Sequence, residues 1–383
     1  MSVTRPLGFR AAGVTAGLKA SGRPDVALVV NDGPQHAVAA VFTTNRVEAA
    51  PVTWSRQVVA DGRADAVFLN SGGANACTGA PGFQDTHRTA ELVAEALDVG
   101  AGDVVVCSTG LIGERLPMDK IEDGLDLAVA ALTDEGGTAA ATAIMTTDTV
   151  SKQAVAERAG WSVGGMAKGA GMLAPALATM LVVLTTDADT EGVDLDAVLR
   201  AATAASFDRI DSDGCMSTND TVALLASGAS GIAPGAEALT EAVTEVCLSL
   251  ARQLIADAEG AHHDIAIEVR SAATVDDALE VARSVARNNL FKCAVFGDDP
   301  NWGRVLAAVG TTQAAFDPHT LDVSMNGVQV CRAGGVGEDR SGVDLSGREV
   351  HVIVELHAGD ETATVWTNDL THDYVHENSA YST

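Results

Sequence analysis

The chain has 383 residues, which is long for a single hydrophobic core and predicts two or more domains. Hydrophobic residues make up 47% and charged residues 20%, as in globular proteins rather than disordered ones. The formal net charge is −28, from 24 basic and 52 acidic residues. This charge argues against nucleic acid or an anionic membrane as a partner, but it leaves room for a local basic pocket that binds a small acidic substrate.

The start of the chain and its cysteines predict a cytoplasmic protein. Residues 1–10 lack the apolar core of a signal peptide, and the longest apolar runs, such as residues 180–184, are too short to span a bilayer. The six cysteines are widely spread without a C-x-x-C pair, which fits reduced thiols better than disulfides or a zinc site. His262 and His263 could suggest a metal, but neighbouring residues of a strand point in opposite directions. We therefore expect no metal and no cofactor.

The first part of the chain predicts alternating strands and helices of an α/β fold. The strands are expected at residues 65–70 and 103–108, and the helices at residues 86–97 and 118–132. A glycine-rich loop at residues 71–79 follows the first strand, and a loop at residues 109–113 follows the second. Loops at the ends of strands often carry the chemistry of α/β proteins, although either loop could also be an ordinary connection.

The middle of the chain changes from a glycine-rich segment to an apolar one. Residues 164–175 read GGMAKGAGMLAP and predict a flexible stretch with one lysine, Lys168. Residues 180–186 are rich in β-branched side chains and predict a buried strand. Thr179 is therefore expected where a loop becomes a buried strand. Taken alone, this position is more typical of a threonine with a structural role than of a nucleophile.

The last third of the chain predicts one long helix and a pair of strands. One apolar face runs along residues 238–256, and Gly260 is expected to cap this helix. Apolar residues alternate over residues 350–356, and this strand is expected to form a hairpin with residues 362–366. Composition and periodicity lead to an α/β protein, most simply an enzyme, and no further.

Several segments match one known family. The most specific one combines K-G-A-G-M in residues 166–175 with A-T-M-L in residues 177–181. The other matching segments are residues 108–113 (STGLIG), 144–149 (IMTTDT), 217–220 (STND), 297–304 (GDDPNWGR) and the tail 369–378. Together they resemble the ornithine acetyltransferase family of arginine biosynthesis over essentially the whole chain. The resemblance implies a self-processing α/β fold with two lobes and N-terminal-nucleophile-like chemistry.

The resemblance also implies a cut between Ala178 and Thr179. It would give an alpha chain of residues 1–178 and a beta chain of residues 179–383, and two copies of each are expected to assemble. The new N-terminal threonine would take an acetyl group from N-acetylornithine and pass it to glutamate. A threonine hydroxyl needs a base, and an α-amino group with a pKa of about 7.7 to 8.0 can serve once the cut has created it.

The remaining site residues are carried over from the family's motifs. The Thr109 hydroxyl and the Gly110 N–H are expected to form the oxyanion hole that stabilises the tetrahedral intermediate. Lys168 is expected to contact the substrate, although a solvated loop lysine is the alternative. Thr146, with Thr147 as a less favoured choice, is expected in the same role. The other expected substrate contacts are Thr179, Glu259, Asn378 and Thr383.

One of two departures from the family pattern matters for the site, and three other functions compete; the lesser departure is at residues 71–75, where the family often has an asparagine in place of Gly73. The usual D-G-E-G-A-T-K is here Asp257-Ala-Glu-Gly-Ala-His-His263, so Glu259 is kept but a lysine is lost. A family member that also uses acetyl-CoA is the first alternative. The second is a self-processing N-terminal-threonine amidohydrolase that transfers to water. The third is a precursor that cleaves itself but serves only in binding or assembly.

Overall fold

The computed structural model describes residues 2–174 and 180–380. These residues have a mixed α/β fold with three sheets, which confirms the predicted fold class. The chain divides into two compact units, in agreement with the number of domains expected from its length. Unit 1 comprises the described residues of Met1–Asp208 and Cys215–Leu254, and unit 2 those of Arg209–Gly214 and Ile255–Ser382. The residues on both sides of the predicted cut belong to unit 1.

The first sheet of unit 1 has the strand order β1-β2-β4-β5. Its strands are β1 (Phe9–Val14), β2 (Val26–Asn31), β4 (Ala66–Ser71) and β5 (Val104–Thr109). β4 and β5 are the two predicted strands, and they run parallel, so Ser71 lies opposite Thr109 where both strands end. The two predicted loops therefore begin side by side.

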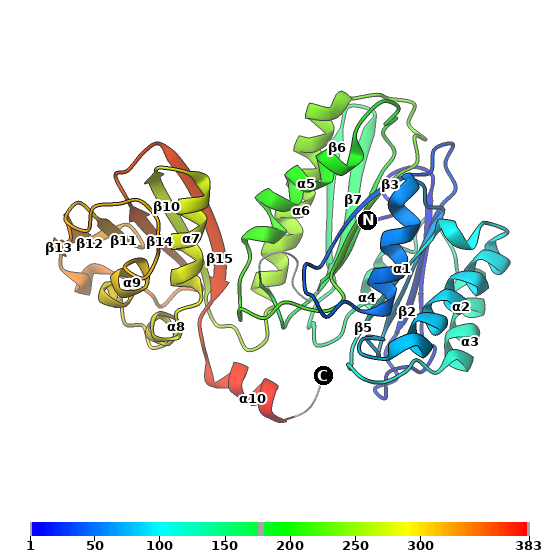
Figure 1. Ribbon diagram of the computed structural model, residues 1–383, viewed down its shortest axis with the longest axis horizontal. Coiled ribbons are helices and arrows are strands. Elements are labelled where there is room, and N and C mark those ends of the chain that lie inside the picture. Colours follow the sequence, from blue (N-terminus) through cyan, green and yellow to red (C-terminus); the bar gives the residue numbers. More distant parts are fainter. Residues whose placement is uncertain (1, 175–179, 381–383) are drawn as a thin grey trace. The chain divides into compact units, whose positions relative to one another are not determined.

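Two helices cover one face of this sheet. They are α2 (Gly79–Leu97) and α3 (Met118–Ala130), and their apolar side chains share a core with β2, β4 and β5 (Figure 1). α3 matches its prediction, but α2 begins before the predicted residue 86. The early start was hidden because residues 79–82 read GAPG, although proline is tolerated in the first turn of a helix.

The second sheet of unit 1 has the order β3-β9-β8-β7-β6. Its strands are β3 (Ala37–Phe42), β9 (Thr221–Ala226), β8 (Leu181–Thr186), β7 (Trp161–Lys168) and β6 (Lys152–Arg158). β8 confirms the buried strand predicted after Thr179. The prediction of a flexible stretch from residue 164 is wrong, because residues 164–168 complete the fully buried strand β7. Small residues are used there for close packing, since a Cβ at Gly165 would lie 2.9 Å from Val246 of the overlying helix.

The two sheets of unit 1 face each other across a shared apolar core. α1 (Ala50–Val58) and α4 (Gly137–Ala143) contribute to this core together with both sheets. α6 (Gly235–Ala256) covers the other face of the second sheet, and α5 (Leu195–Ala205) packs beside β3 (Figure 1). α6 confirms the long predicted helix. Short 3-10 turns lie at η1 (Val59–Asp61), η2 (Ala101–Asp103), η3 (Phe207–Arg209) and η4 (Arg340–Gly342).

Unit 2 is a single sheet with the order β13-β12-β11-β14-β10-β15, covered on one face by helices. Its strands are β10 (Asp264–Ala272), β11 (Asp322–Met325), β12 (Val328–Arg332), β13 (Gly335–Val336), β14 (Glu349–Glu355) and β15 (Glu361–Asn368). Its helices are α7 (Val275–Ala286), α8 (Asn289–Phe296), α9 (Trp302–Val309) and α10 (His372–Ala380).

The hairpin predicted for the C-terminal strands is wrong. Both strands exist as β14 and β15, but β10 lies between them, parallel to β14 and antiparallel to β15. The physical reason is that β10 alternates buried Ile265, Ile267 and Val269 and needs a neighbour on each side to complete its backbone hydrogen bonds. The sequence between β14 and β15 has the residues of a turn. It does not reveal that β10, from an earlier part of the chain, lies between the two strands.

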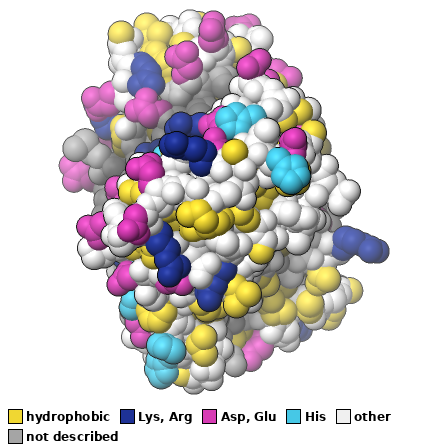
Figure 2. Space-filling view, turned by 90° about the vertical axis from the view of Figure 1, so that its left-hand side faces the viewer, with side chains coloured by type: hydrophobic (Ala, Val, Ile, Leu, Met, Phe, Trp, Pro, Cys, Tyr) yellow, Lys and Arg dark blue, Asp and Glu magenta, His cyan; other side chains and the backbone are white. Residues whose placement is uncertain are grey.

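The surface carries charges of both signs despite the net charge of −28. Figure 2 shows acidic, basic and apolar side chains interspersed on the face it presents. Among the described residues, no helix has both the length and the apolar character that crossing a membrane requires.

Candidate active site

The loop after β5 packs closely against the loop after β4. The Thr109 carbonyl accepts the N–H groups of Gly72 (2.9 Å) and Gly73 (3.0 Å), which joins the two predicted loops. Gly110 has a φ of 128°, and a Cβ there would lie 2.6 Å from the nitrogen of Gly73, so only glycine fits. Within residues 2–174 and 180–380, no group accepts a hydrogen bond from the Gly110 N–H. That N–H is therefore available to a ligand.

Lys168 lies beside this loop and is buried rather than solvated, which rules out the alternative of a solvated loop lysine. Only 1% of Lys168 is exposed, and its Nζ donates a hydrogen bond to Thr109 Oγ1 over 3.3 Å. Because the ammonium group donates, the Thr109 hydroxyl proton stays free to donate to a third group. Lys168 ends β7 and pairs with Leu181 of β8. This pairing brings the oxyanion loop to the chain that directly follows Thr179.

Asp148 organises the buried charges around Lys168. Its Oδ1 accepts hydrogen bonds from Lys152 Nζ (2.6 Å) and from the Gly169 N–H (2.7 Å). Burial acts to raise the pKa of Asp148, but the charges of Lys168 and Lys152 and the Gly169 N–H bring it down to about 2. Asp148 is therefore ionised, and its charge interacts with both Lys168 and Lys152. The buried ammonium group of Lys168 lies next to the Thr109 hydroxyl.

Thr146 is held in the same network. Its N–H donates to Asp148 Oδ2 over 2.9 Å, and its carbonyl accepts from Arg23 Nη2 over 2.8 Å. Lys19 Nζ donates to the Met145 carbonyl over 2.6 Å, and burial followed by the charge of Arg23 lowers the pKa of Lys19 to about 8. These contacts fix the backbone at Thr146. They also form a local basic region in an acidic protein.

Residues 217–220 hold the loops and β8 together. Asn219 Nδ2 donates to the carbonyl of Ala74 (2.6 Å) in the loop after β4 and to that of Ser108 (2.9 Å) near the end of β5. Asp220 Oδ1 accepts the N–H of Met180 over 2.9 Å. This segment and residues 144–149 are among the motifs that resemble the family. The sequence nevertheless predicted no functional role for Asp148, Asn219 or Asp220. Their local sequences, MTTD and STND, are polar and give no sign that these three side chains are buried.

Glu259 and Asn378 form a second group, in unit 2. Asn378 Nδ2 donates to Glu259 Oε2 over 3.0 Å and to the Tyr374 carbonyl over 3.0 Å. The sequence assigned Gly260 to the cap of α6, but that helix ends at Ala256. Gly260 instead has a φ of 61°, and a Cβ there would overlap the backbone of Asp373 and Tyr374. Because residue 260 has no Cβ, α10 can pack directly against the backbone there. This packing places Asn378 within hydrogen-bond distance of Glu259.

The two histidines that replace the family's usual residues hold the C-terminal segment. His262 Nε2 lies 2.8 Å from Asp373 Oδ2, and the buried His263 has Nδ1 2.8 Å from Asp369 Oδ2. Each ring thus has its own carboxylate partner. The departure from the motif adds contacts to the start of α10 and leaves the Glu259–Asn378 pair in place.

Three predicted positions, Ala178, Thr179 and Thr383, lie outside the described residues. The structure brings Thr109, Gly110, Thr146 and Lys168 into one group in unit 1, and Glu259 and Asn378 into another in unit 2. The first group combines a free N–H, a hydroxyl and a buried ammonium. Such donors stabilise the negative oxygen that develops in acyl transfer.

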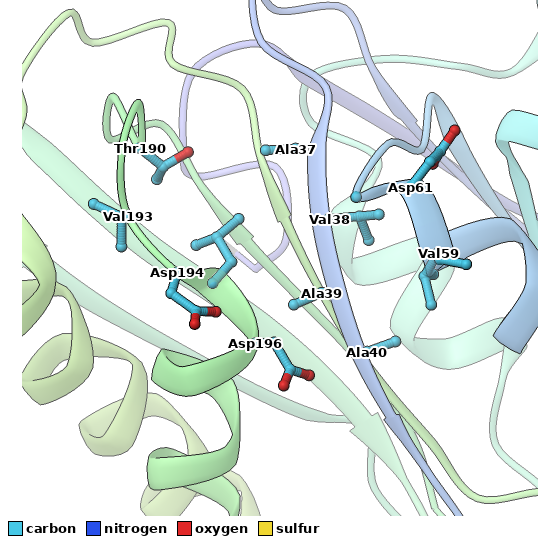
Figure 3. A pocket seen from close by; sticks show the side chains of 13 residues that line it. Ala37, Val38, Ala39, Ala40, Val59, Asp61, Thr190, Val193, Asp194 and Asp196 are labelled. Atoms are coloured by element: carbon cyan, nitrogen blue, oxygen red, sulfur yellow. The ribbon is translucent and has the colours of Figure 1, made fainter.

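The cavity shown in Figure 3 has a different character. It has a volume of about 530 Å³ and lies between β3, residues 59–62 and the start of α5. Its walls carry Asp61, Asp194 and Asp196 and none of the predicted site residues. An acidic lining disfavours a substrate that carries carboxylates, so this cavity is separate from the candidate site.

Comparison with known proteins identifies the family. The model of the ArgJ family matches residues 10–383. Proteins named arginine biosynthesis bifunctional protein ArgJ from Streptomyces coelicolor and Streptomyces avermitilis are 65% and 66% identical over 382 residues, with 100% of each chain covered. A solved ornithine acetyltransferase complexed with ornithine, from Mycobacterium tuberculosis, is 58% identical over 47% of this chain and 96% of its own, at a TM-score of 0.45. From the family model and the full-length sequence matches, the chain belongs to the ArgJ family of arginine biosynthesis.

Proposed function

We propose that the chain cuts itself between Ala178 and Thr179 and then transfers acetyl from N-acetylornithine to glutamate, with Thr179 as the nucleophile. The observation that carries the proposal is the link from Thr109 through Lys168 to Leu181. Lys168 Nζ contacts Thr109 Oγ1, and Lys168 pairs in the sheet with Leu181, two residues after Thr179 in the sequence. The oxyanion donors and the chain that follows the nucleophile therefore share one buried site.

The proposed chemistry has two stages. In the first, the Thr179 hydroxyl attacks the Ala178 carbonyl, the peptide bond breaks, and water hydrolyses the resulting ester. In the second, the freed α-amino group takes the hydroxyl proton, and the hydroxyl oxygen receives acetyl from N-acetylornithine with release of ornithine. Glutamate then accepts the acetyl group and restores the hydroxyl. Thr109, Gly110 and Lys168 stabilise the oxyanion that forms in each transfer.

The other predicted residues have complementary roles in this proposal. Lys168 and the nearby basic side chains attract the carboxylates of the substrates, and Thr146 is held in position by Asp148. Glu259 would bind a cationic amino group of ornithine, and Asn378 orients Glu259. Thr383 is proposed to contact the substrate. We further propose that two alpha and two beta chains assemble in the cytoplasm.

A second candidate is a bifunctional enzyme that also acetylates glutamate from acetyl-CoA. The observation that favours it is that relatives 65% and 66% identical to this chain carry the word bifunctional in their names. Both activities would use the same acetyl-threonine. They differ only in whether N-acetylornithine or acetyl-CoA donates the acetyl group to Thr179.

An assay of acetyl transfer tests the proposal. We expect purified protein to form N-acetylglutamate from N-acetylornithine and glutamate, with parallel initial-rate lines, because a covalent intermediate separates the two half-reactions. The same assay with acetyl-CoA as donor decides between the two candidates. Release of free acetate without N-acetylglutamate would contradict the proposal and indicate an amidohydrolase. Absence of any turnover in cleaved protein would indicate a binding or assembly role.

A further inference from the structure

The loop at residues 15–25, between β1 and β2, brings a half-buried lysine to the first group of site residues. The loop is held by Asp25, whose carboxylate accepts the N–H groups of Leu18 (2.6 Å) and Lys19 (2.9 Å). Asp25 is 0% exposed, and its carbonyl accepts the Ser71 N–H over 2.8 Å. Lys19 therefore belongs to a loop that is itself fixed to the end of β4.

The ammonium group of Lys19 binds backbone carbonyls. Its Nζ donates to the carbonyls of Pro24 (2.8 Å) and Met145 (2.6 Å), and it lies 3.5 Å from that of Ala143. Ala143 is the last residue of α4, and a cation is favourable at the C-terminus of a helix, so one role of Lys19 is to cap α4. The contact with Met145 reaches beyond that helix, to the residue before Thr146.

The two peptide groups on either side of Thr146 are both held by charged side chains. The Met145 carbonyl and the Thr146 N–H belong to one planar peptide group. Lys19 holds its carbonyl, and the ionised Asp148 holds its N–H over 2.9 Å. The carbonyl of the next peptide group, that of Thr146 itself, accepts Arg23 Nη2 over 2.8 Å. Three charged partners therefore set the direction of the Thr146 side chain, and Lys19 and Arg23 come from the same loop.

The charge of Lys19 changes at mildly alkaline pH. Burial lowers its pKa to about 8, and the charges of Arg23 and Lys168 act in the same direction, whereas those of Asp25 and Asp148 oppose it. These four side chains face Lys19 from its own loop, from β7 and from the segment after α4. When its proton leaves, Lys19 loses its charge and one of its three donors. Its hold on the backbone carbonyls weakens as a result.

We propose that Lys19 is a positioning residue, which keeps the Thr146 side chain in place for the substrate by holding the Met145 carbonyl. The inference rests on the proposed function, in which Thr146 contacts the substrate, and it adds a residue on which that contact depends. Such a contact is made in the bound substrate and in the transition state alike, so its loss raises KM and leaves kcat almost unchanged. A lysine that only capped α4 would lower the melting temperature without this selective effect.

The variant Lys19→Met removes the charge and the donors at nearly the same side-chain length. We expect KM for N-acetylornithine to rise by about tenfold and kcat to change by less than about threefold. Lys19→Arg keeps a charge that is not lost in this range of pH. In the wild type, KM should therefore rise above about pH 8, whereas in Lys19→Arg it should stay nearly constant through that pH.

A double-mutant cycle tests whether Lys19 acts through Thr146. Thr146→Ala should raise KM by itself. Lys19→Met should then raise KM by less than about twofold more, because the side chain that Lys19 positions is gone. A purely structural lysine would affect both backgrounds equally.

Lys120→Met is the matched control. Lys120, in α3, is an exposed lysine that donates to the carbonyl of Gly17 in the same loop over 2.6 Å. Its removal takes one charge and one loop contact away but leaves the contact between Lys19 and Met145 in place. We expect KM to stay at the wild-type value.

Three results would overturn the inference. The first is an unchanged KM in Lys19→Met when Thr146→Ala raises it, and the second is an equal effect of Lys19→Met with and without the Thr146 side chain. The third is an equal rise of KM in Lys120→Met. If thermal melting shows that Lys19→Met does not fold, the pH series decides, and the same dependence of KM on pH in the wild type and in Lys19→Arg contradicts the inference.

Failure of the proposed function would give different results. A wild-type protein that transfers no acetyl would overturn that function as a whole, and this inference with it. An active protein in which Thr146→Ala leaves KM unchanged would remove only the role of Thr146 in binding the substrate, and with it the role of Lys19.

Discussion

At the scale of single residues, the candidate site is an arrangement of buried charges that must be compensated. The side chains of Lys152 and Asp148 are both 0% exposed, and Lys152 Nζ lies 2.6 Å from Asp148 Oδ1. Lys168 is a second buried cation. Removing one partner of such a pair typically costs about 3 to 5 kcal/mol, because the other charge stays buried. The arrangement is therefore costly to change, and it leaves a positive charge next to the Thr109 hydroxyl. In the proposed mechanism, this charge would help to stabilise the oxyanion of acyl transfer.

Thr109 gives the most direct prediction at this scale. Removing one oxyanion donor typically lowers kcat by about 10² to 10³. We expect Thr109→Ala to lower kcat for acetyl transfer at least tenfold and to change KM much less, because the lost interaction forms mainly in the transition state. Cleavage should still occur, since its oxyanion forms on the Ala178 carbonyl instead of on the acetyl group.

A buried hydroxyl on α1 that contacts the same strand, β5, provides the control for Thr109. Ser55 Oγ donates to the Val106 carbonyl over 2.7 Å and accepts the Val106 N–H over 2.9 Å, without contact to the oxyanion loop. Ser55→Ala should lower the melting temperature and leave kcat near wild type. If Thr109→Ala behaves in the same way, Thr109 has only a structural role.

The residue scale also shows how far the sequence could predict the site. The family motifs located Thr109, Gly110, Thr146 and Lys168, and the structure brings these four residues together. The motifs gave no role to Asp148 or Asp220, because a carboxylate in a sequence does not reveal its burial or its partner. Burial comes from strands distant in the sequence: Asp220 precedes β9 and Asp148 lies between α4 and β6.

At the scale of elements, strands with local signals were predicted well and pairings between distant segments were not. β4, β5 and β8 follow from short apolar runs, and α3 and α6 follow from one apolar face. β7 was misread because glycine suggests flexibility, whereas here it permits close contact with α6. The C-terminal hairpin failed because β10 is inserted between β14 and β15. Such tertiary pairing has no local signature.

Gly260 connects two elements of unit 2 and yields a prediction at this scale. In Gly260→Ala the Cβ would overlap the backbone of α10 at Asp373 and Tyr374, and the φ of 61° is unfavourable for alanine. We expect α10 to shift, the Asn378–Glu259 hydrogen bond to break, and the free energy of unfolding to fall by about 1 kcal/mol or more. KM for N-acetylornithine should rise.

Another glycine of unit 2 serves as the control for Gly260. A Cβ at Gly347 meets nothing within 4 Å. Gly347→Ala should therefore change the free energy of unfolding by less than about 0.5 kcal/mol and leave KM unaltered. Thermal melting and initial rates on both variants measure these effects. An unchanged KM in a destabilised Gly260→Ala protein would show that Asn378 and Glu259 have no role in binding the substrate.

At the scale of the whole molecule, the compact units and the proposed alpha and beta chains divide the sequence differently. Unit 1 contains the residues on both sides of the proposed cut, and residues 168 and 181 pair within one sheet. Cleavage would therefore leave β7 and β8 hydrogen-bonded to each other although they end on separate chains. This pairing would hold the two proposed products together. The net charge of −28 is compatible with a small basic site buried inside unit 1.

The mass of the denatured protein, before and after brief incubation with N-acetylornithine, tests the central claim most directly. We predict two chains of about 18 and 21 kDa by their share of the residues, with one acetyl group added to the larger chain after incubation. Thr179→Ala should give a single uncut chain and no adduct, since both steps need the hydroxyl. A single mass of 39.0 kDa in a wild-type protein that transfers acetyl at full rate would contradict the account.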